Sequence, residues 1–225
     1  MGHVKKKYDI TKYNFDKHIK GCYNVDDLTK LHLLDLSLCN SEMLTQDNEA
    51  ETFFHKKFYQ KFNDGWFEIR EVFHNFVKNE VSPLFNEDFL YQTFPSYRVQ
   101  VPNQIAVSNW HYDNDEDHNH PEWEINFQIA ITDMFDTNCM WIESVPGLGD
   151  FQPVELKYGE FAIFNGNRCR HGNKQNNTKV SRVSFDFRVL PYSRFDPDNI
   201  RYSYYGKPFA AGGYYTLFKK GDLNV

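Results

Sequence analysis

Large apolar residues recur with a helical period between Glu51 and Val81. The stripe consists of aromatic and aliphatic residues three or four positions apart: Phe54, Phe58, Phe62, Trp66, Ile69, Phe73 and Phe76. This spacing predicts amphipathic helices that bury one face. Gly65 predicts a break between two helices, since glycine costs about 1 kcal/mol in a helix interior, and Pro83 predicts the end of the second.

From about Tyr97 the pattern changes to an alternation of apolar and polar residues, which is typical of β-strands. Candidate strands are 97–101, 104–113, 124–132, 139–144, 153–157, 160–164 and 179–189. Turn residues separate them: Pro146, Gly147, Gly149, Gly159, Gly166 and Gly172. Many short strands between turns favour a sandwich or barrel. The predicted fold class is mainly β with flanking helices: a double-stranded β-helix (a cupin-like jelly roll) with an N-terminal helical segment packed on one sheet.

We expect the chain, residues 1–225, to form a single domain. Within it, residues 1–96 are expected as an N-terminal helical cover, 97–190 as the jelly-roll core and 191–225 as a C-terminal tail. A short helix over 28–34 could begin at Asp26 or Asp27. The tail is rich in tyrosine: Tyr202, Tyr204, Tyr205, Tyr214 and Tyr215. It forms either a lid over a pocket or a segment packed outside the barrel.

Composition excludes several classes of function. The formal charge is 25 − 31 = −6, so no broad basic surface indicates nucleic-acid binding. No apolar run approaches the roughly 18 residues of a membrane span, and no apolar segment follows the charged residues 1–7 as in a secretory signal. The four cysteines lack CxxC spacing and fit reduced thiols. We therefore expect a cytoplasmic protein without membrane or nucleic-acid partners. Its oligomeric state is open, a homodimer included.

Candidate metal ligands follow the extended run 104–109. Side chains two apart on a strand point the same way, so His111 and Asp113 can converge on one point. A second imidazole, His171, arrives 58 positions later (171 − 113), far enough to cross a sandwich and return. Two histidines and one carboxylate form the facial triad of non-haem Fe(II) oxygenases. The sequence thus predicts an iron site with His111, Asp113 and His171 as the catalytic ligands.

A candidate co-substrate site follows on the segment 179–189. Its apolar face holds Val183, Phe185, Phe187 and Val189, and its polar face holds Arg182, Ser184, Asp186 and Arg188. Such a strand could be a half-solvated sheet edge. However, Arg182 lies eleven residues after His171 (182 − 171), where its guanidinium can bind a carboxylate through two hydrogen bonds and Ser184 can add a third. This arrangement indicates a site for a dicarboxylate.

The motifs resemble one family. They are Trp110-His111-Tyr112-Asp113, Glu124-Ile125-Asn126-Phe127, Trp141-Ile142-Glu143-Ser144, Pro153-Val154-Glu155-Leu156-Lys157-Tyr158-Gly159, His171-Gly172 and the segment 182–189. Together they resemble the 2-oxoglutarate/Fe(II) oxygenases of the streptomycin-biosynthesis type and their relatives in bacterial carbohydrate gene clusters. The resemblance runs from about Arg98 to Leu190, with a weaker similarity at 212–215.

The resemblance implies an oxidoreductase with Fe(II) and 2-oxoglutarate as cofactor and co-substrate. Iron would bind His111, Asp113 and His171, and 2-oxoglutarate would be held by Arg182 with Ser184, beside Asn126. The expected reaction uses O2 to convert 2-oxoglutarate to succinate and carbon dioxide while oxidising a small polar metabolite. A sugar, aminocyclitol or nucleotide-linked sugar is the substrate class that the resemblance suggests.

Other assignments compete for some of these residues. His118, His120 and Glu124 imitate the first motif of a cupin-type metal enzyme, with His171 as the fourth ligand, although the glycine expected after Glu124 is absent. His118 and His120 could instead lie in a solvated acidic loop. A hydrolytic zinc site also accepts two histidines and a carboxylate, but no helical HExxH motif accompanies them. A non-catalytic carbohydrate-binding jelly roll is the alternative outside enzymes.

Substrate contacts are the least defined part of the sequence. Trp110, Tyr112 and Trp141 are candidate platforms for a sugar ring, and Glu143 could accept hydrogen bonds from hydroxyl groups. Each of the four is equally compatible with packing inside the fold.

Overall fold

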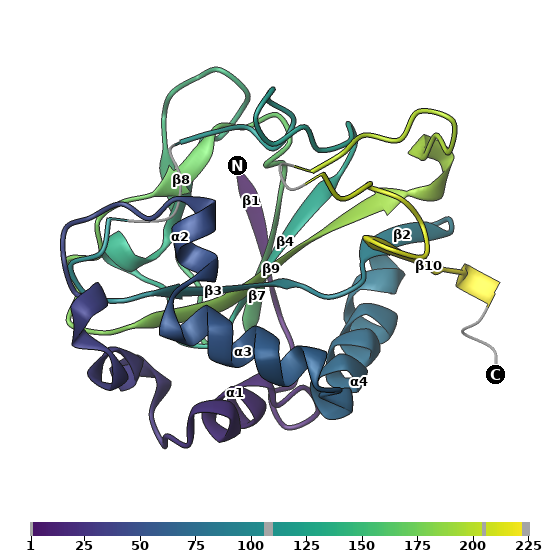
Figure 1. The fold of residues 1–225 in the computed structure, drawn as a ribbon. Helices are drawn as coiled ribbons and strands as arrows, with labels where there is room; N and C mark the ends of the chain where they lie inside the picture. The colour runs from purple at the N-terminus through teal and green to yellow at the C-terminus, as the bar shows by residue number, and fades with distance from the viewer. Residues whose placement is uncertain (1, 106–109, 204–205, 222–225) are drawn as a thin grey trace.

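The computed structural model describes residues 2–105, 110–203 and 206–221. In this part of the chain ten strands form two antiparallel sheets (Figure 1). The strands are β1 (His3–Lys7), β2 (Phe89–Gln92), β3 (Ser96–Gln100), β4 (Ile125–Ala130), β5 (Met140–Ile142), β6 (Gln152–Val154), β7 (Glu160–Phe164), β8 (His171–Asn173), β9 (Arg182–Pro191) and β10 (Tyr215–Phe218). The helices are α1 (Phe15–Tyr23), α2 (Gln46–Ala50), α3 (Phe53–Asn63) and α4 (Phe67–Phe76). The predicted mainly β fold with flanking helices is confirmed.

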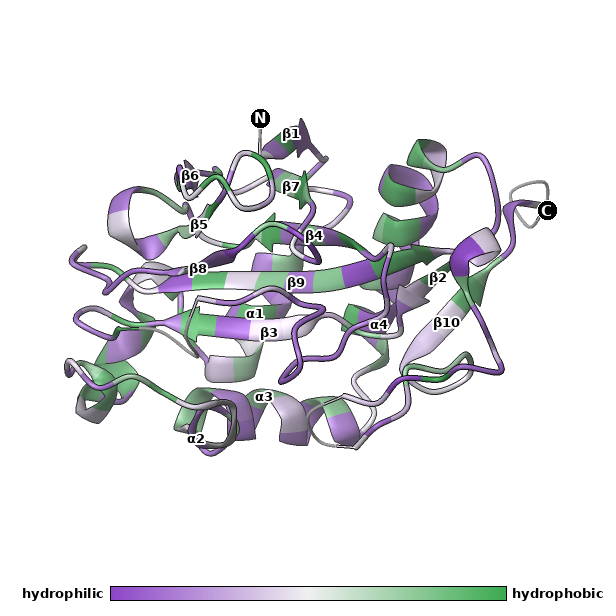
Figure 2. Ribbon diagram, turned by 90° about the horizontal axis from the view of Figure 1, so that it is seen from above, coloured by the Kyte–Doolittle hydropathy of each residue, from purple (hydrophilic) through white to green (hydrophobic). Residues whose placement is uncertain are grey.

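The large sheet has the order β1-β7-β4-β9-β2-β10, and β3 pairs with the other half of β9. The alternation predicted for 179–189 is visible along β9 (Figure 2). β9 lies between two neighbours and is buried on both faces, so its interpretation as a solvated edge is wrong. Its polar face is covered by the rest of the protein, not by bulk solvent.

The apolar face of the large sheet packs against α1, α3 and α4, which lie below the sheet in Figure 1. Aromatic rings make most of this contact: Phe58 of α3 stacks on Tyr97 at a centroid distance of 4.1 Å, and Phe73 of α4 meets Phe187 edge-to-face at 5.1 Å. The predicted break between the helices is confirmed at Gly65, whose φ of +94° favours glycine. The apolar period of the sequence thus encodes the helix–sheet interface.

Replacing Phe58 by alanine is expected to destabilise the fold by about 3–5 kcal/mol, because it opens a cavity under α3. The side chain is fully buried and contacts Tyr97 and Phe185. Urea unfolding monitored by circular dichroism measures the effect. Phe67→Ala is the matched control, since that ring is 76% exposed and its loss should change stability by less than about 0.5 kcal/mol. Equal effects of the two variants would contradict this description of the core.

The small sheet has the order β6-β5-β8. β8 is an edge strand of this sheet, and its residue His171 forms an isolated antiparallel bridge with His111. The expected strand 104–113 falls partly outside the described residues, since 106–109 are not among them. The other candidate strands are present with boundaries shifted by a few residues. The described residues of 104–113, which are 104–105 and 110–113, do not form a strand, but an isolated bridge at His111 still places this residue beside β8.

The segments outside the expected core also contribute strands. β1 and β2 come from residues 1–96, and β10 comes from the tail. β1 was not predicted because four of its five residues are exposed, as suits an edge strand, and the lysine run hides the strand pattern. The short helix expected over 28–34 is a 3-10 helix whose first turn is capped by the Asp27 side chain. Among the described residues, none of the helices is long and apolar enough to cross a membrane.

Candidate metal centre and surrounding cavity

The two candidate histidine ligands lie on adjacent backbone segments. His111 and His171 exchange both backbone hydrogen bonds, each with an N···O distance of 3.0 Å. Gly172 follows His171, and a Cβ atom there would lie 2.9 Å from the Trp110 ring. The glycine therefore allows the tryptophan to pack directly on β8. The imidazole centroids of the two histidines are 4.5 Å apart.

Asp113 completes the cluster. Its side chain is fully buried, and its backbone N–H donates to the Gly166 carbonyl at 3.0 Å. The Asp113 Oδ1 atom lies 3.5 Å from Nε2 of His111 and 3.6 Å from Nε2 of His171. The ligand atoms of the three residues all lie within 4.8 Å of one another. The structure thus brings together the three residues that the sequence singled out as metal ligands.

The second oxygen of Asp113 faces the protein. Its Oδ2 accepts a hydrogen bond from Asn126 Nδ2 at 2.6 Å and one from Arg188 Nε at 3.1 Å, and Nη2 of Arg188 reaches Oδ1 at 3.4 Å. The Asn126 side-chain oxygen in turn accepts from the Gly166 N–H at 3.1 Å. Both ends of the Asn126 amide are therefore bonded within the protein. It lines the cavity, and its bonds fix the orientation of the Asp113 carboxylate.

Electrostatics favour the protonation states that a metal requires. Burial disfavours the charged form of Asp113, but the Arg188 guanidinium and the neighbouring histidines, His111 first among them, together outweigh it and hold the Asp113 pKa well below its usual value. Burial lowers the pKa of His171 to about 4. Its Nδ1 lies 3.1 Å from the Cys169 carbonyl, which can only accept, so Nδ1 carries the proton and Nε2 presents a lone pair. An ionised carboxylate and a neutral imidazole are both competent ligands.

The His171 shift predicts how the stability of the metal-free protein depends on pH. Because the folded-state pKa of about 4 lies below the value of 6.5 in the unfolded chain, the unfolded state binds the proton more readily between these values. Stability should fall as the pH drops from 6.5 to about 4, by roughly 3 kcal/mol in total, and this contribution should level off below that. Urea unfolding at a series of pH values measures the slope.

Two variants identify the group responsible. His171→Asn should flatten the dependence in this pH window, whereas His18→Asn on α1, far along the chain from the cluster, should leave most of it in place. A dependence that survives unchanged in His171→Asn would contradict the assignment.

An alternating chain of charges continues from Asp113 across the polar face of the large sheet. Arg188 Nη1 binds Asp186 Oδ2 at 3.1 Å, and Asp186 Oδ1 accepts from Arg98 Nε at 2.8 Å. Arg98 Nη1 then binds Glu49 Oε2, on α2, at 2.7 Å. Each buried carboxylate thus has a guanidinium partner, the condition under which buried charges are tolerated. The network fixes Arg188, which in turn holds the orientation of Asp113.

Arg182 differs from the other two arginines on this face. It is only 4% exposed, yet the described part of the chain gives its guanidinium no carboxylate partner. Its hydrogen bonds go to Ser184 Oγ at 2.9 Å and Gln100 Oε1 at 3.4 Å, and its Nε has none. Burial, followed by repulsion from Arg98, lowers its pKa to about 10. An uncompensated buried cation is costly and indicates an anionic ligand.

His111 and His171 of the cluster, together with Arg182, open onto one cavity of about 940 Å³. The polar faces of β4 and β9 form its floor, and β8 with the two histidines forms one wall. Residues of α2 and α3 and the described residues 203, 207–209, 213 and 214 of the tail enclose it further. The tail therefore contributes to the cavity wall. Of the tyrosines considered for a lid, Tyr204 and Tyr205 lie outside the described residues.

The aromatic residues considered for a substrate platform have other contacts. Trp110 packs edge-to-face on Phe151 at 4.4 Å, and Lys174 covers the Trp141 ring at 3.2 Å. Tyr112 is half-buried. None of the three tyrosine or tryptophan side chains lines the cavity. Their expected role as a sugar platform is therefore not carried into the proposal below.

Glu143 also has a different environment from the one expected. Its carboxylate accepts backbone hydrogen bonds from Gly147 at 3.2 Å, Gly149 at 3.0 Å and Arg170 at 2.8 Å. Burial is outweighed by these bonds, which lower the Glu143 pKa. The residue is 3% exposed and does not line the cavity. Its contacts order the turn after β5, so it is not available to substrate hydroxyl groups.

The cupin-type ligand set is not brought together. His120 Nδ1 lies 2.8 Å from Glu124 Oε2, while His118 Nδ1 lies 2.7 Å from Asp115 Oδ1. Among the described residues, the group placed to hold a metal ion is His111, Asp113 and His171. His118 and His120 are half-buried and line the cavity, so their interpretation as part of a solvated loop is also wrong.

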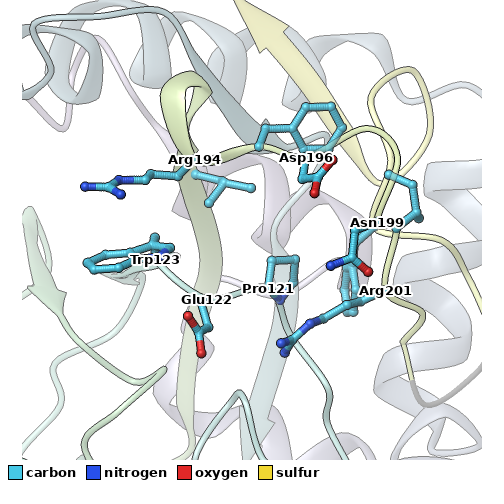
Figure 3. Close-up of a pocket in the computed structure, with 11 residues that line it drawn as sticks. Pro121, Glu122, Trp123, Arg194, Asp196, Asn199 and Arg201 are labelled. Atoms are coloured by element: carbon cyan, nitrogen blue, oxygen red, sulfur yellow. The ribbon is translucent and has the colours of Figure 1, made fainter.

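A second, smaller pocket of about 200 Å³ is lined by Pro121, Glu122 and Trp123, which directly follow these histidines in the chain (Figure 3). Arg194 lies over the exposed Trp123 ring, 4.4 Å from its centroid. Trp123 has a φ of +72°, a left-handed conformation that is rare for a bulky residue. Phe209 borders both pockets. Arg201 crosses from this side to donate to the His120 carbonyl at 3.0 Å.

Comparisons with known proteins agree with the sequence motifs. No family model matches the chain. The chain is 30% identical over 213 residues to the streptomycin biosynthesis protein StrG of Streptomyces griseus, which covers 95% of this chain and 97% of StrG. Two structures of the non-heme monooxygenase ThoJ match at 14% identity. The apo form has a TM-score of 0.55 and covers 95% of this chain and 82% of ThoJ, and the nickel complex has a TM-score of 0.52 and covers 97% and 80%. At this identity the ThoJ likeness concerns the fold alone.

Proposed function

The chain belongs to the family of the streptomycin biosynthesis protein StrG, and on that premise we propose that it is an Fe(II)- and 2-oxoglutarate-dependent oxygenase. Its substrate is proposed to be a small polar metabolite, of the sugar, aminocyclitol or nucleotide-linked sugar class. The observation that carries the proposal is the placement of two kinds of group on one cavity. These are the His111–Asp113–His171 cluster and the buried Arg182, for which the described part of the chain supplies no carboxylate partner.

The strand order supports a double-stranded β-helix as the scaffold. One sheet contains β3-β9-β4-β7 at its centre, and the other is β6-β5-β8 followed by the His111 bridge. Each sheet thus alternates early and late strands of the segment 96–191. An eight-stranded jelly roll requires this alternation. The two histidine ligands lie at the β8 edge of the small sheet.

The donor set fits ferrous iron. Nε2 of each histidine and Oδ1 of Asp113 face one another, and two nitrogen donors with one oxygen donor are the ligands of the facial triad. We infer that His111, Asp113 and His171 hold the metal. Arg188 and Asn126 keep Asp113 Oδ2 bonded on the opposite side, so that a single oxygen is directed toward the metal. Removing such supporting hydrogen bonds typically lowers the metal affinity by about 10–100-fold.

The second half of the site fits 2-oxoglutarate. Arg182 and Ser184 are proposed to bind the carboxylate remote from the metal, because a guanidinium with a neighbouring hydroxyl presents three donors to two carboxylate oxygens. The anion would compensate the buried charge that Arg182 carries alone. When bound, Fe(II) and 2-oxoglutarate supply the oxidising chemistry, in which O2 and 2-oxoglutarate give succinate, carbon dioxide and an oxidised C–H bond. The protein orients both ligands and limits the access of water.

Formation of succinate tests the proposal directly. Purified protein with ferrous iron, 2-oxoglutarate and O2 is expected to form succinate slowly without substrate, and faster when a panel of polar metabolites contains an acceptable one. The cupin-type and carbohydrate-binding alternatives predict no succinate under either condition. Absence of both succinate and 2-oxoglutarate binding by calorimetry would overturn the proposed function.

A further inference from the structure

His118 and His120 have no role in the proposed iron and 2-oxoglutarate sites, yet both line the same cavity. The His118 ring stacks almost parallel on the candidate ligand His111, with centroids 4.0 Å apart and an interplanar angle of 13°. The His120 ring packs against Phe209 at 4.5 Å. Two further imidazoles thus lie next to the metal cluster and line the same cavity.

Each of these imidazoles is oriented by a carboxylate. His118 Nδ1 lies 2.7 Å from Asp115 Oδ1, and His120 Nδ1 lies 2.8 Å from Glu124 Oε2. An ionised carboxylate can only accept a hydrogen bond, so Nδ1 carries the proton in both histidines. In the neutral imidazole this leaves Nε2 as an acceptor. The described part of the chain provides no hydrogen-bond partner for either Nε2.

The carboxylate behind His120 is itself fixed. Glu124 is 2% exposed, and its second oxygen accepts a hydrogen bond from the Tyr215 hydroxyl of β10. Asp115 also accepts from the backbone N–H of His118 at 2.9 Å, which ties the side chain to the turn that it orients. Neither imidazole can therefore rotate without breaking a charged hydrogen bond.

The backbone between the histidines is held equally firmly. Asn119 has a φ of +54°, a left-handed conformation that asparagine tolerates better than most residues. Its N–H donates to the Asp115 carbonyl at 2.8 Å, and the His120 N–H donates to the carbonyl of Asp113 at 2.9 Å. Arg201, which lies 81 positions further along the chain, also donates to the His120 carbonyl at 3.0 Å. A solvated loop does not need this many anchors, whereas a recognition element does.

From these contacts we propose that His118 and His120 form a substrate subsite beside the metal, which recognises hydroxyl groups of an uncharged polyol ring through the two Nε2 acceptors. The inference rests on the proposed function and specifies its substrate class. Acceptors fixed in a half-buried site disfavour a phosphate or carboxylate at this position, and an apolar group would leave both of them unpaired.

The charge of the cavity wall argues against an ammonium group. Among the described residues the wall carries Arg70, Arg98, Arg182, Arg188 and Lys207, against Glu49 and Asp186. Both of those carboxylates are already paired with Arg98 or Arg188. A neutral hydroxyl donor avoids the repulsion that a cationic amine would meet among these groups.

Asparagine and glutamine variants distinguish the two functions of each imidazole: the Nδ1 contact that orients the ring and the Nε2 acceptor that would bind the substrate. The asparagine amide occupies the position of Nδ1, so His118→Asn and His120→Asn keep the carboxylate contact and lose the acceptor. The glutamine amide reaches the position of Nε2, so His118→Gln and His120→Gln keep an acceptor toward the cavity. His74→Asn is the matched control, because its Nδ1 also bonds a neighbouring side chain, the Tyr91 hydroxyl at 2.8 Å, but His74 does not line the cavity.

Binding of myo-inositol and D-glucose, with cyclohexanol as a comparator bearing one hydroxyl, tests the proposal. Ligand-detected NMR is recorded on the anaerobic protein with Fe(II) and 2-oxoglutarate, and circular dichroism confirms that each variant is folded. We expect at least one polyol to bind more tightly than cyclohexanol. Each asparagine variant should weaken that binding about tenfold, the effect of one lost hydrogen bond, and the matching glutamine variant should restore part of it.

Two results would overturn the subsite: no polyol binds better than cyclohexanol, or the asparagine variants bind like the His74→Asn control. Titration of 2-oxoglutarate into the same wild-type sample keeps this outcome separate from the proposed function. If 2-oxoglutarate binds while the histidine variants behave like the control, the subsite is wrong and the proposed function stands. If 2-oxoglutarate does not bind, the proposed function itself fails.

Discussion

His111→Ala is expected to weaken Fe(II) binding by more than about 100-fold while the protein remains folded. The expected loss exceeds the 10–100-fold effect of removing a group that merely supports a ligand, because here a ligand itself is removed. The side chain of His111 is 19% exposed, so its truncation leaves a shallow space and not a closed cavity. Iron content after anaerobic loading and gel filtration, measured by elemental analysis, gives the result.

His111 is a better choice for this experiment than Asp113. Asp113 is fully buried and compensates Arg188, so its removal would leave an unpaired buried cation and endanger the fold. His18→Ala on α1 serves as the control, since that ring packs on Trp66 at 6.3 Å, within the helical layer. Iron retained by His111→Ala at the wild-type level would remove this residue from the metal site.

Arg182→Ala is expected to weaken 2-oxoglutarate binding by about 2–5 kcal/mol, the range for removing one partner of a buried charge pair. The same substitution should not destabilise the protein without ligand. It removes a buried cation that has no carboxylate partner among the described residues, and such a charge opposes folding. Loss of affinity without loss of stability is characteristic of a residue retained for ligand binding.

Calorimetric titration gives the affinity and thermal unfolding gives the stability. Arg168→Ala is the control for the affinity, because Arg168 is exposed and does not line the cavity. Unchanged 2-oxoglutarate affinity in Arg182→Ala would show that the co-substrate site lies elsewhere. A large drop in stability would instead indicate that the guanidinium has a structural role.

The sequence predicted the parts of the molecule that depend on local pattern. The period of Phe54, Phe58 and Phe62 identified the helical layer, and the alternation of 179–189 identified β9. The two-residue spacing of His111 and Asp113 led to the correct prediction that they converge, although the strand assumed for it is absent at these residues: His111 forms an isolated bridge and Asp113 lies in a turn. For the third ligand, His171, the sequence provided only a candidate position, because its place beside His111 depends on the pairing of distant segments.

The support of the site was not predictable in the same way. Arg188 and Asp186 occupy the polar face of β9, and a polar face normally indicates solvent. In this fold the face is turned into a cavity, so the same residues become a buried ion network that positions Asp113. Runs of alternating opposite charge on one strand face, as in Arg182, Asp186 and Arg188, are the signal that could have indicated a buried network.

The sequence suggested that Glu143 is available to substrate and that His118 could be solvated, and the structure differs in both cases. Glu143 has the chemistry of a substrate acceptor, but backbone N–H groups of a following turn bind it. His118 lies in an acidic stretch that reads as a solvated loop, but Asp115 orients it toward the cavity. In both cases the decisive partner belongs to a turn whose conformation the residue pattern does not determine.

The most direct test of the central claim is an anaerobic calorimetric titration of 2-oxoglutarate into the protein, with and without Fe(II). If the His111–Asp113–His171 cluster and Arg182 form one site, 2-oxoglutarate should bind with one molecule per chain when iron is present, and much more weakly when it is absent. Equal binding with and without iron, or no binding in either case, would contradict the account.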